Sequence, residues 1–118
     1  MKVLIVDDSR AMRIIVKRTL KQAGFDASVT EAENGRQALD AIDAGKPDLV
    51  LTDWAMPEMN GLELVQAITD NDLGVPVGMV ASQGTPEMKQ QAREAGALFM
   101  LNKPFTADGL RDALDGVV

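Results

Sequence analysis

The chain has 118 residues, of which 46% are hydrophobic and 25% are charged, and its formal net charge is −6. This length and apolar content predict one domain with a buried core, while the acidic balance argues against nonspecific nucleic-acid binding, which depends on Lys and Arg. The absence of Cys and His excludes disulfides, thiolate nucleophiles, His-based triads, His metal ligands and a phosphohistidine carrier role.

The chain begins with an apolar run over residues 3–6, which is typical of a strand buried on both faces. Asp7 and Asp8 follow at once, so the segment becomes acidic too early for a signal peptide. Elsewhere no run is long and apolar enough to span a bilayer. We therefore expect a cytoplasmic protein without membrane insertion.

A helix is expected next, capped by Ser9 and ending at Gly24. Its buried stripe is predicted from apolar residues at helical spacing, namely Met12, Ile15, Val16, Thr19, Leu20 and Ala23. The basic residues fall on another face, which we expect to be solvated, namely Arg10, Arg13, Lys17 and Lys21. Ile14 also points away from the stripe, which predicts an exposed hydrophobic side chain available for docking.

The middle of the chain contains an apolar run that ends in a single carboxylate. A weaker strand with interleaved polar residues is expected over residues 27–32, at an edge of the sheet, followed by a helix that ends at Gly45. Residues 49–53 are nearly all apolar and end in Asp53, which predicts a buried strand carrying a carboxylate at its C-terminal end. A loop then leads to Gly61 and a third helix.

The last part of the chain repeats the alternation of strand and helix. A fourth strand is expected over residues 77–80, and Thr85 and Pro86 open the next helix as its cap and first helical residue. A fifth strand is expected over residues 98–101, after which Thr106 caps the last helix. Five such alternations predict an α/β fold, a doubly wound five-stranded parallel sheet with helices on both faces.

Charged residues follow three of the expected strands. They are Asp7 and Asp8, Asp53, and Lys103. Ligands of open α/β sheets bind at the carboxyl ends of the strands, so we expect these side chains to share one crevice. Two like charges about 4 Å apart cost roughly 4 kcal/mol at an effective dielectric of about 20, and oxygen ligands alone favour a hard ion such as Mg²⁺. The alternative is an acid cluster relieved by raised pKa values or by Lys103 alone.

A buried carboxylate beside such a cation can accept a phosphoryl group, so we interpret Asp53 as a phosphoryl acceptor. Taken alone, a strand-terminal Asp such as Asp53 would be interpreted as a residue that caps a turn, and the rest of the chain reverses that preference. The competing class is a two-metal phosphatase or nuclease, which would need more acids and a basic substrate groove. The sequence offers no obvious groove of that kind.

Three motifs at these positions resemble the receiver domains of bacterial two-component response regulators. They are Val6-Asp7-Asp8-Ser9, the segment from Asp53-Trp54-Ala55-Met56-Pro57 to Gly61, and Lys103-Pro104-Phe105. The resemblance covers essentially the whole chain and is greatest to single-domain chemotaxis regulators of the CheY type. It implies a flavodoxin-like strand order 2-1-3-4-5, one receiver domain over residues 1–118 and no output domain.

The resemblance also implies a role for each matching residue. Asp53 would accept the phosphoryl group from a sensor histidine kinase, and Lys103 would contact its oxygens. Asp8, Asp53 and the backbone carbonyl of Ala55 would bind Mg²⁺, with Asp7 acting through water. The Lys103–Pro104 bond would be cis. Apart from self-phosphorylation and self-dephosphorylation, no enzymatic activity is expected.

Partner surfaces follow from the same resemblance. The first helix, with Ile14, would dock the kinase. The fourth helix, fifth strand and fifth helix, including Met100, would bind a downstream effector protein, for which the flagellar motor switch is a candidate. Signalling in chemotaxis is therefore expected.

Two positions depart from the family pattern. Ala81 stands where a Thr or Ser hydroxyl usually meets the phosphoryl group, and Ser82 follows one residue later, on the other face of a regular strand. Met100 replaces the usual aromatic residue three positions before Lys103. Ser82 could be recruited by a loop rearrangement, Met100 could switch differently, or the chain could be a phosphate sink or a pseudo-receiver that acts independently of phosphate.

Overall fold

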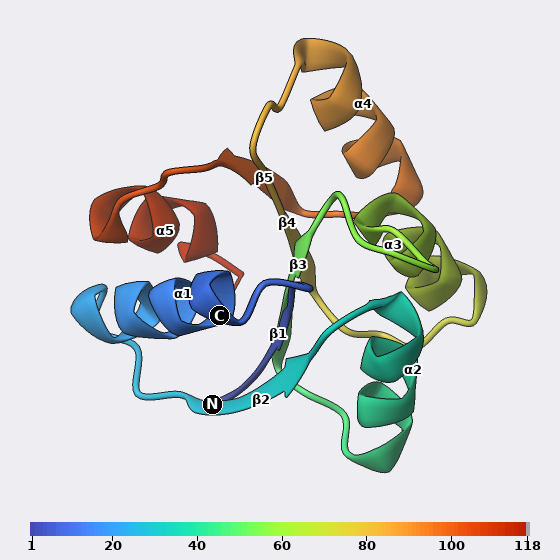
Figure 1. The fold of residues 1–118 in the computed structure, drawn as a ribbon, viewed down its shortest axis with the longest axis horizontal. Coiled ribbons are helices and arrows are strands. Elements are labelled where there is room, and N and C mark those ends of the chain that lie inside the picture. The colour runs from blue at the N-terminus through green and yellow to red at the C-terminus, as the bar shows by residue number, and fades with distance from the viewer. Residues whose placement is uncertain (118) are drawn as a thin grey trace.

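Five parallel strands form the centre of the molecule, in the order β2-β1-β3-β4-β5 (Figure 1). This computed structural model describes residues 1–117. The strands are β1 (Lys2–Val6), β2 (Ser28–Ala32), β3 (Leu49–Asp53), β4 (Val77–Ala81) and β5 (Phe99–Asn102). The helices are α1 (Arg10–Gln22), α2 (Gly35–Ala44), α3 (Gly61–Asp70), α4 (Pro86–Ala95) and α5 (Ala107–Leu114). The predicted fold class and strand order are confirmed.

Two apolar layers hold the helices on opposite faces of the sheet. On one face, Val3, Ile5 and Leu51 pack against α1 and α5. On the other face, Leu4 and Val50 pack against α2, α3 and α4. Alternate residues of β1 thus serve opposite layers, which is why its run is apolar throughout. Figure 1 shows α1 and α5 together on one side of the strands and the remaining helices on the other.

Strand register aligns the carboxyl ends that carry the charged residues. Val6, the last residue of β1, pairs with Thr52, next to Asp53. Asp53 pairs with Val80 of β4, and Ala81 pairs with Asn102, next to Lys103. The ends of β1, β3 and β5 therefore meet at one edge of the sheet, as expected for parallel strands.

Side-chain caps start the helices, and each accepts a hydrogen bond from the backbone N–H three residues later. The predicted caps Ser9, Thr85 and Thr106 are confirmed. Asn34 caps α2 in the same way, and Asn60 caps α3 through a capping box with Glu63. The first residues of α1 and α3 are thereby fixed directly beside the ends of β1 and β3.

The prediction for α1 was wrong at two residues. Ile15 is 47% exposed rather than buried, and Arg13 is only 8% exposed rather than solvated. The buried seam consists of Arg13, Val16, Thr19 and Leu20. Arg13 can occupy this seam because its guanidinium hydrogen-bonds the carbonyl of Asp7 and the carboxylate of Glu31. Ile15 lies outside this seam, whereas Ile14 is exposed as predicted.

Smaller differences concern the strand ends. β2 is an edge strand as predicted but begins at Ser28. β4 extends to Ala81, and β5 is shifted by one residue, which leaves Leu98 55% exposed before it.

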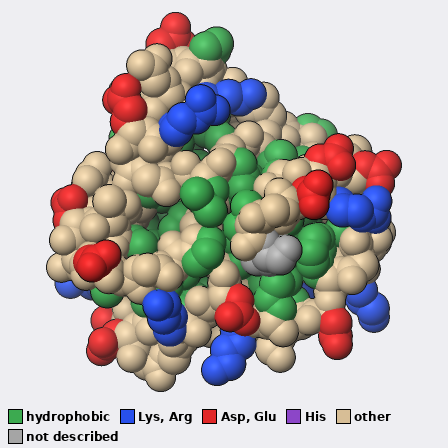
Figure 2. All heavy atoms as spheres, turned by 180° about the vertical axis from the view of Figure 1, so that it is seen from behind, with side chains coloured by type: hydrophobic (Ala, Val, Ile, Leu, Met, Phe, Trp, Pro, Cys, Tyr) green, Lys and Arg blue, Asp and Glu red, His purple; other side chains and the backbone are tan. Residues whose placement is uncertain are grey.

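Within residues 1–117, no helix combines the length and apolar character needed to cross a membrane. On the face shown in Figure 2, hydrophobic side chains gather near the centre, and basic side chains are dispersed among acidic ones.

Candidate functional site

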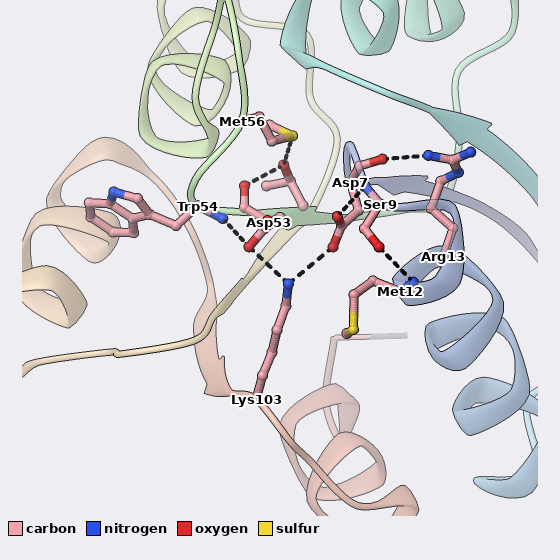
Figure 3. A network of polar contacts seen from close by, with 9 residues as sticks. Asp7, Ser9, Met12, Arg13, Asp53, Trp54, Met56 and Lys103 are labelled. Atoms are coloured by element: carbon pink, nitrogen blue, oxygen red, sulfur yellow. Dashed lines mark hydrogen bonds and ion pairs between the residues drawn. The ribbon is translucent and has the colours of Figure 1, made fainter.

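Asp53 ends the central strand β3 and lies at the bottom of the site. Asp53 is buried, with only 8% of its surface exposed. Its Oδ1 accepts a hydrogen bond from the backbone N–H of Trp54 at 2.9 Å and lies 3.1 Å from Nζ of Lys103 (Figure 3). One carboxylate oxygen of Asp53 is thus held by two donors from different strand ends.

Lys103 joins Asp53 to the first strand. Its Nζ is 3.1 Å from Oδ2 of Asp7, and the side chain of Lys103 is 13% exposed. The other oxygen of Asp7, Oδ1, accepts a hydrogen bond from the backbone N–H of Ser9 at 2.9 Å. The ammonium therefore lies between two buried carboxylates, as Figure 3 shows. The Lys103–Pro104 peptide bond is cis, as the resemblance implied.

Asp8 completes an acidic group with Asp7 and Asp53. One carboxylate oxygen from each of the three residues lies within 4.8 Å of the others. Asp7 and Asp53 are buried, whereas Asp8 is exposed at the mouth of the site. The structure thus brings together the four charged residues that the sequence placed at the strand ends.

The charges of this group do not balance. Burial raises the pKa of the Asp53 carboxyl, the charge of Asp7 raises it further, and Lys103 only partly offsets these effects. Burial alone would lower the pKa of the Lys103 ammonium, but Asp7 and Asp53 outweigh it and raise that pKa above the ordinary value. Three carboxylates facing one ammonium carry surplus negative charge, and their oxygens suit a hard divalent cation such as Mg²⁺.

A cavity of about 260 Å³ opens beside Asp53. Its lining residues are Asp53, Trp54, Ala55, Ala81, Ser82, Gln83 and Met88. Ala81 is 1% exposed, whereas Ser82 is exposed. Both residues border the same cavity, so the opposite-face argument does not keep Ser82 away from it. Ala55 also lies beside Asp53, and the role of its carbonyl stays a prediction.

The predicted switch and docking residues lie outside the charged group. Met100 is half-buried in β5 and packs against the layer that contains α2, α3 and α4. A Cβ built on Gly84, in the loop after β4, would come within 2.7 Å of Cε of Met100, so this loop packs closely over β5. Ile14 lies on α1, where it lines a separate cavity of about 650 Å³ next to β2.

Sequence reasoning missed two residues that shape the site. Gly61 donates its backbone N–H to the carbonyl of Trp54 at 2.8 Å, and a Cβ there would collide with the backbone oxygen of Asp53. Arg13 donates to the backbone carbonyl of Asp7 at 2.7 Å. The glycine was visible as the start of a helix, but its closeness to Asp53 depends on packing between elements. Nothing in the local pattern distinguished Arg13 from the other basic residues of α1.

Comparisons with known proteins point to one family. The response regulator receiver domain family matches residues 3–115. The chain is 42% identical to chemotaxis protein CheY1 of Helicobacter pylori, an alignment that covers 100% of this chain and 97% of the relative. It is 41% identical to chemotaxis protein CheY of Listeria monocytogenes, with coverage of 98% and 96%. The solved structure of chemotaxis protein CheY4 of Vibrio cholerae has a TM-score of 0.86 and 36% identity, covering 99% of this chain and 98% of that one.

Proposed function

The chain belongs to the response regulator receiver domain family, whose members are signalling domains of phosphorelays, and from this premise we propose that Asp53 is its phosphoryl acceptor. One observation carries the proposal. The buried Asp53 carboxylate lies 3.1 Å from the Lys103 ammonium in a group with two further acids. A carboxylate in such a setting is a nucleophile that can form an acyl phosphate.

The two oxygens of Asp53 have different surroundings. Oδ1 is engaged by the backbone N–H of Trp54 and by Lys103. We therefore assign the attack to Oδ2, which forms the new bond to phosphorus. The bond between phosphorus and the donor nitrogen of a phosphohistidine breaks, and its electron pair leaves with the imidazole. Lys103 stays beside Asp53 and neutralises charge on the transferred oxygens.

The acids of the site fit a resident Mg²⁺, because all the donors are hard oxygen atoms and their negative charge exceeds the positive charge of the Lys103 ammonium. Asp8, Asp53 and the carbonyl of Ala55 would hold the ion directly, and Asp7 would hold it through water. When bound, Mg²⁺ supplies positive charge to the phosphoryl oxygens as they are transferred.

The partners that we propose are those of chemotaxis phosphorelays, since the curated relatives are chemotaxis proteins. A sensor histidine kinase in the cytoplasm donates the phosphoryl group and docks on α1 with Ile14, which is 47% exposed. A downstream effector, with the flagellar motor switch as first candidate, binds the face of α4, β5 and α5 that contains Met100. No nucleic-acid partner is proposed.

A second candidate function is supported by Ala81. Ala81 lines the cavity beside Asp53, at the position from which a hydroxyl would otherwise meet the phosphoryl group. Without that hydroxyl, phosphorylation has one contact fewer through which to move the loop after β4. The alternative is therefore a phosphate sink or a receiver whose partner binding is independent of phosphate, and in the latter case Asp53→Asn would leave partner binding unchanged.

Fluorescence of Trp54 tests the proposal, because it is the only Trp of the chain and directly follows Asp53. We expect a change when Mg²⁺ is added and a second change when beryllofluoride, a phosphoryl mimic, follows. In Asp53→Asn the second change should be absent. A folded wild-type protein whose fluorescence responds to neither addition would overturn the proposal.

A further inference from the structure

Arg13 is a buried cation directly behind the acidic group. Its side chain is 10% exposed. Nη1 donates to the backbone carbonyl of Asp7 at 2.7 Å, and Nε donates to Oε1 of Glu31 at 2.9 Å (Figure 3 shows the contact with Asp7). Neither contact reaches a carboxylate of the site. Arg13 therefore ties α1 to the end of β1 and to the edge strand β2.

The carbonyl that Arg13 holds belongs to the peptide group between Asp7 and Asp8. The carbonyl oxygen of Asp7 and the Cα of Asp8 lie in the same rigid plane, so a hydrogen bond that fixes the oxygen also fixes the position of this Cα. The preceding peptide is held as well, because the N–H of Asp7 donates to the carbonyl of Ala32 at 3.0 Å. Asp7 has its carboxylate anchored by Ser9 and Lys103, whereas Asp8 is exposed. Arg13 thus holds the backbone directly before Asp8.

From these contacts we infer that Arg13 is a positioning residue that holds Asp8 in place to bind Mg²⁺, with Glu31 holding the guanidinium. This inference rests on the proposed function of the site. The planar guanidinium suits the task, because one of its N–H groups donates to a carbonyl while another donates to a carboxylate in a fixed relative geometry. A buried Arg that lost either partner would pay for its desolvation.

Glu31 makes the arrangement stable at neutral pH. The hydrogen bond from Arg13 lowers the pKa of the Glu31 carboxyl, and the charges of Lys17 and Arg13 lower it further against the effect of its slight burial. Lys17 lies 3.7 Å from the other oxygen of Glu31. The carboxylate is therefore ionised wherever the receiver would work, and it fixes the orientation of the guanidinium.

Charge and position predict opposite effects of removing Arg13. If Arg13 acted only as a nearby positive charge, its loss would tighten Mg²⁺ binding, because it repels the ion. If it positions Asp8, its loss weakens binding, because Asp8 must then be ordered when the ion binds. Loss of a residue that orients metal ligands typically costs about 10–100-fold in affinity. The sign of the change therefore separates the two roles.

The test is a Mg²⁺ titration of folded protein followed by Trp54 fluorescence, with Tm measured in parallel. We expect Arg13→Met to raise the dissociation constant by roughly 10-fold or more. Arg13→Lys keeps the charge but not the planar fork, and it should also weaken binding. The matched control is Arg111→Met, since Arg111 on α5 donates to the carbonyl of Ala23 at the far end of α1 and to the carboxylate of Asp108 on α5 itself. This control should leave the dissociation constant unchanged.

The outcomes distinguish this inference from the proposed function. Wild-type protein that shows no Mg²⁺ binding, by fluorescence or calorimetry, overturns the proposed metal site itself. Wild-type binding with an unchanged or smaller dissociation constant in Arg13→Met overturns the positioning role alone, even if Tm falls. Should Arg13→Met fail to fold, Glu31→Gln decides, because it leaves Arg13 in place and loosens its orientation. Weaker Mg²⁺ binding in Glu31→Gln supports the inference, and unchanged binding overturns it.

Discussion

At the scale of single residues, Asp53 lies in surroundings that disfavour its charge. It is buried beside Asp7, and the ammonium of Lys103 is shared between the two carboxylates. A bound cation, with or without an incoming phosphoryl group, would reduce the excess of negative charge around Asp53. The acceptor is therefore kept in a state that costs stability until its ligands arrive, as is common at functional sites.

The cost should be visible in the pH dependence of stability. Because folding raises the pKa of Asp53, the native state binds its proton more tightly. The stability that this gives is fully present below the unfolded pKa of Asp53 and is lost as pH rises through its native pKa. We expect Asp53→Asn to raise Tm at pH 7 without Mg²⁺, by roughly 4 °C for each kcal/mol relieved. The difference from wild type should shrink as pH falls through the native pKa of Asp53 and level off below the pKa of unfolded Asp. Thermal unfolding from pH 3 to 8 measures it, and a lower Tm for Asp53→Asn at pH 7 would contradict this reasoning.

Ala81 offers a second prediction at the same scale. Ala81 lines the cavity of about 260 Å³ beside Asp53, so we expect a slightly larger side chain at this position to extend into it. In Ala81→Thr, the added hydroxyl should donate to the phosphoryl mimic, and a hydrogen bond to a charged group contributes about 1.5–3 kcal/mol. We expect beryllofluoride to bind roughly 10-fold or more tightly.

Ala81→Val is the matched control, because Val has the shape of Thr without the hydroxyl. Fluorescence titration of both variants with beryllofluoride at saturating Mg²⁺ separates shape from hydrogen bonding. Equal affinities for the Thr and Val variants would show that the missing hydroxyl does not limit the response.

At the scale of elements, the site depends on how closely α3 approaches the end of β3. Gly61 is the first residue of α3, and a Cβ there would collide with the backbone oxygen of Asp53 and come within 2.8 Å of Sδ of Met79. The helix can start beside the acceptor only because this residue has no side chain.

Gly61→Ala should therefore destabilise the fold by about 1–3 kcal/mol, the usual cost of overpacking, and shift Asp53. Urea unfolding and the Mg²⁺ titration measure both effects. Gly45→Ala is the control, since a Cβ at the C-cap of α2 meets nothing within 4 Å. Equal stabilities of the two variants would contradict the proposed closeness of α3 to Asp53.

The helices and strands also show which features of the fold could be predicted from the sequence. Apolar runs and capping residues predicted the alternation, the edge position of β2 and the convergence of Asp7, Asp53 and Lys103, because these depend on local pattern and on the geometry of parallel sheets. The burial of Arg13 and the exposure of Ile15 were not predictable in this way. The burial of Arg13 depends on its hydrogen bond to Glu31 on another strand, and hydrophobic periodicity carries no information about such a partner.

At the scale of the whole molecule, ligand binding and stability are linked. Asp7 and Asp8 follow β1 whereas Asp53 ends β3, far away in the sequence, so Mg²⁺ would bind only when the fold has brought these acids together. A ligand that binds only the native state stabilises it by about 2.7 kcal/mol at a concentration of 100 times its dissociation constant.

We therefore expect Mg²⁺ to raise the Tm of the wild type and a chelator to reverse the effect. Asp8→Asn should change the metal-free Tm little, because Asp8 is exposed, and should lose most of the increase. NaCl at matched ionic strength controls for screening. The same Mg²⁺-dependent increase in Asp8→Asn would contradict the assigned ligand.

Transfer of a phosphoryl group to Asp53 can be measured by intact mass after incubation with acetyl phosphate and Mg²⁺. The account predicts one phosphoryl adduct on the wild type, labile to alkali as an acyl phosphate is, and its absence in Asp53→Asn or when the metal is chelated. A folded wild-type protein that acquires no adduct, or an equally labile adduct that persists in Asp53→Asn, would contradict it.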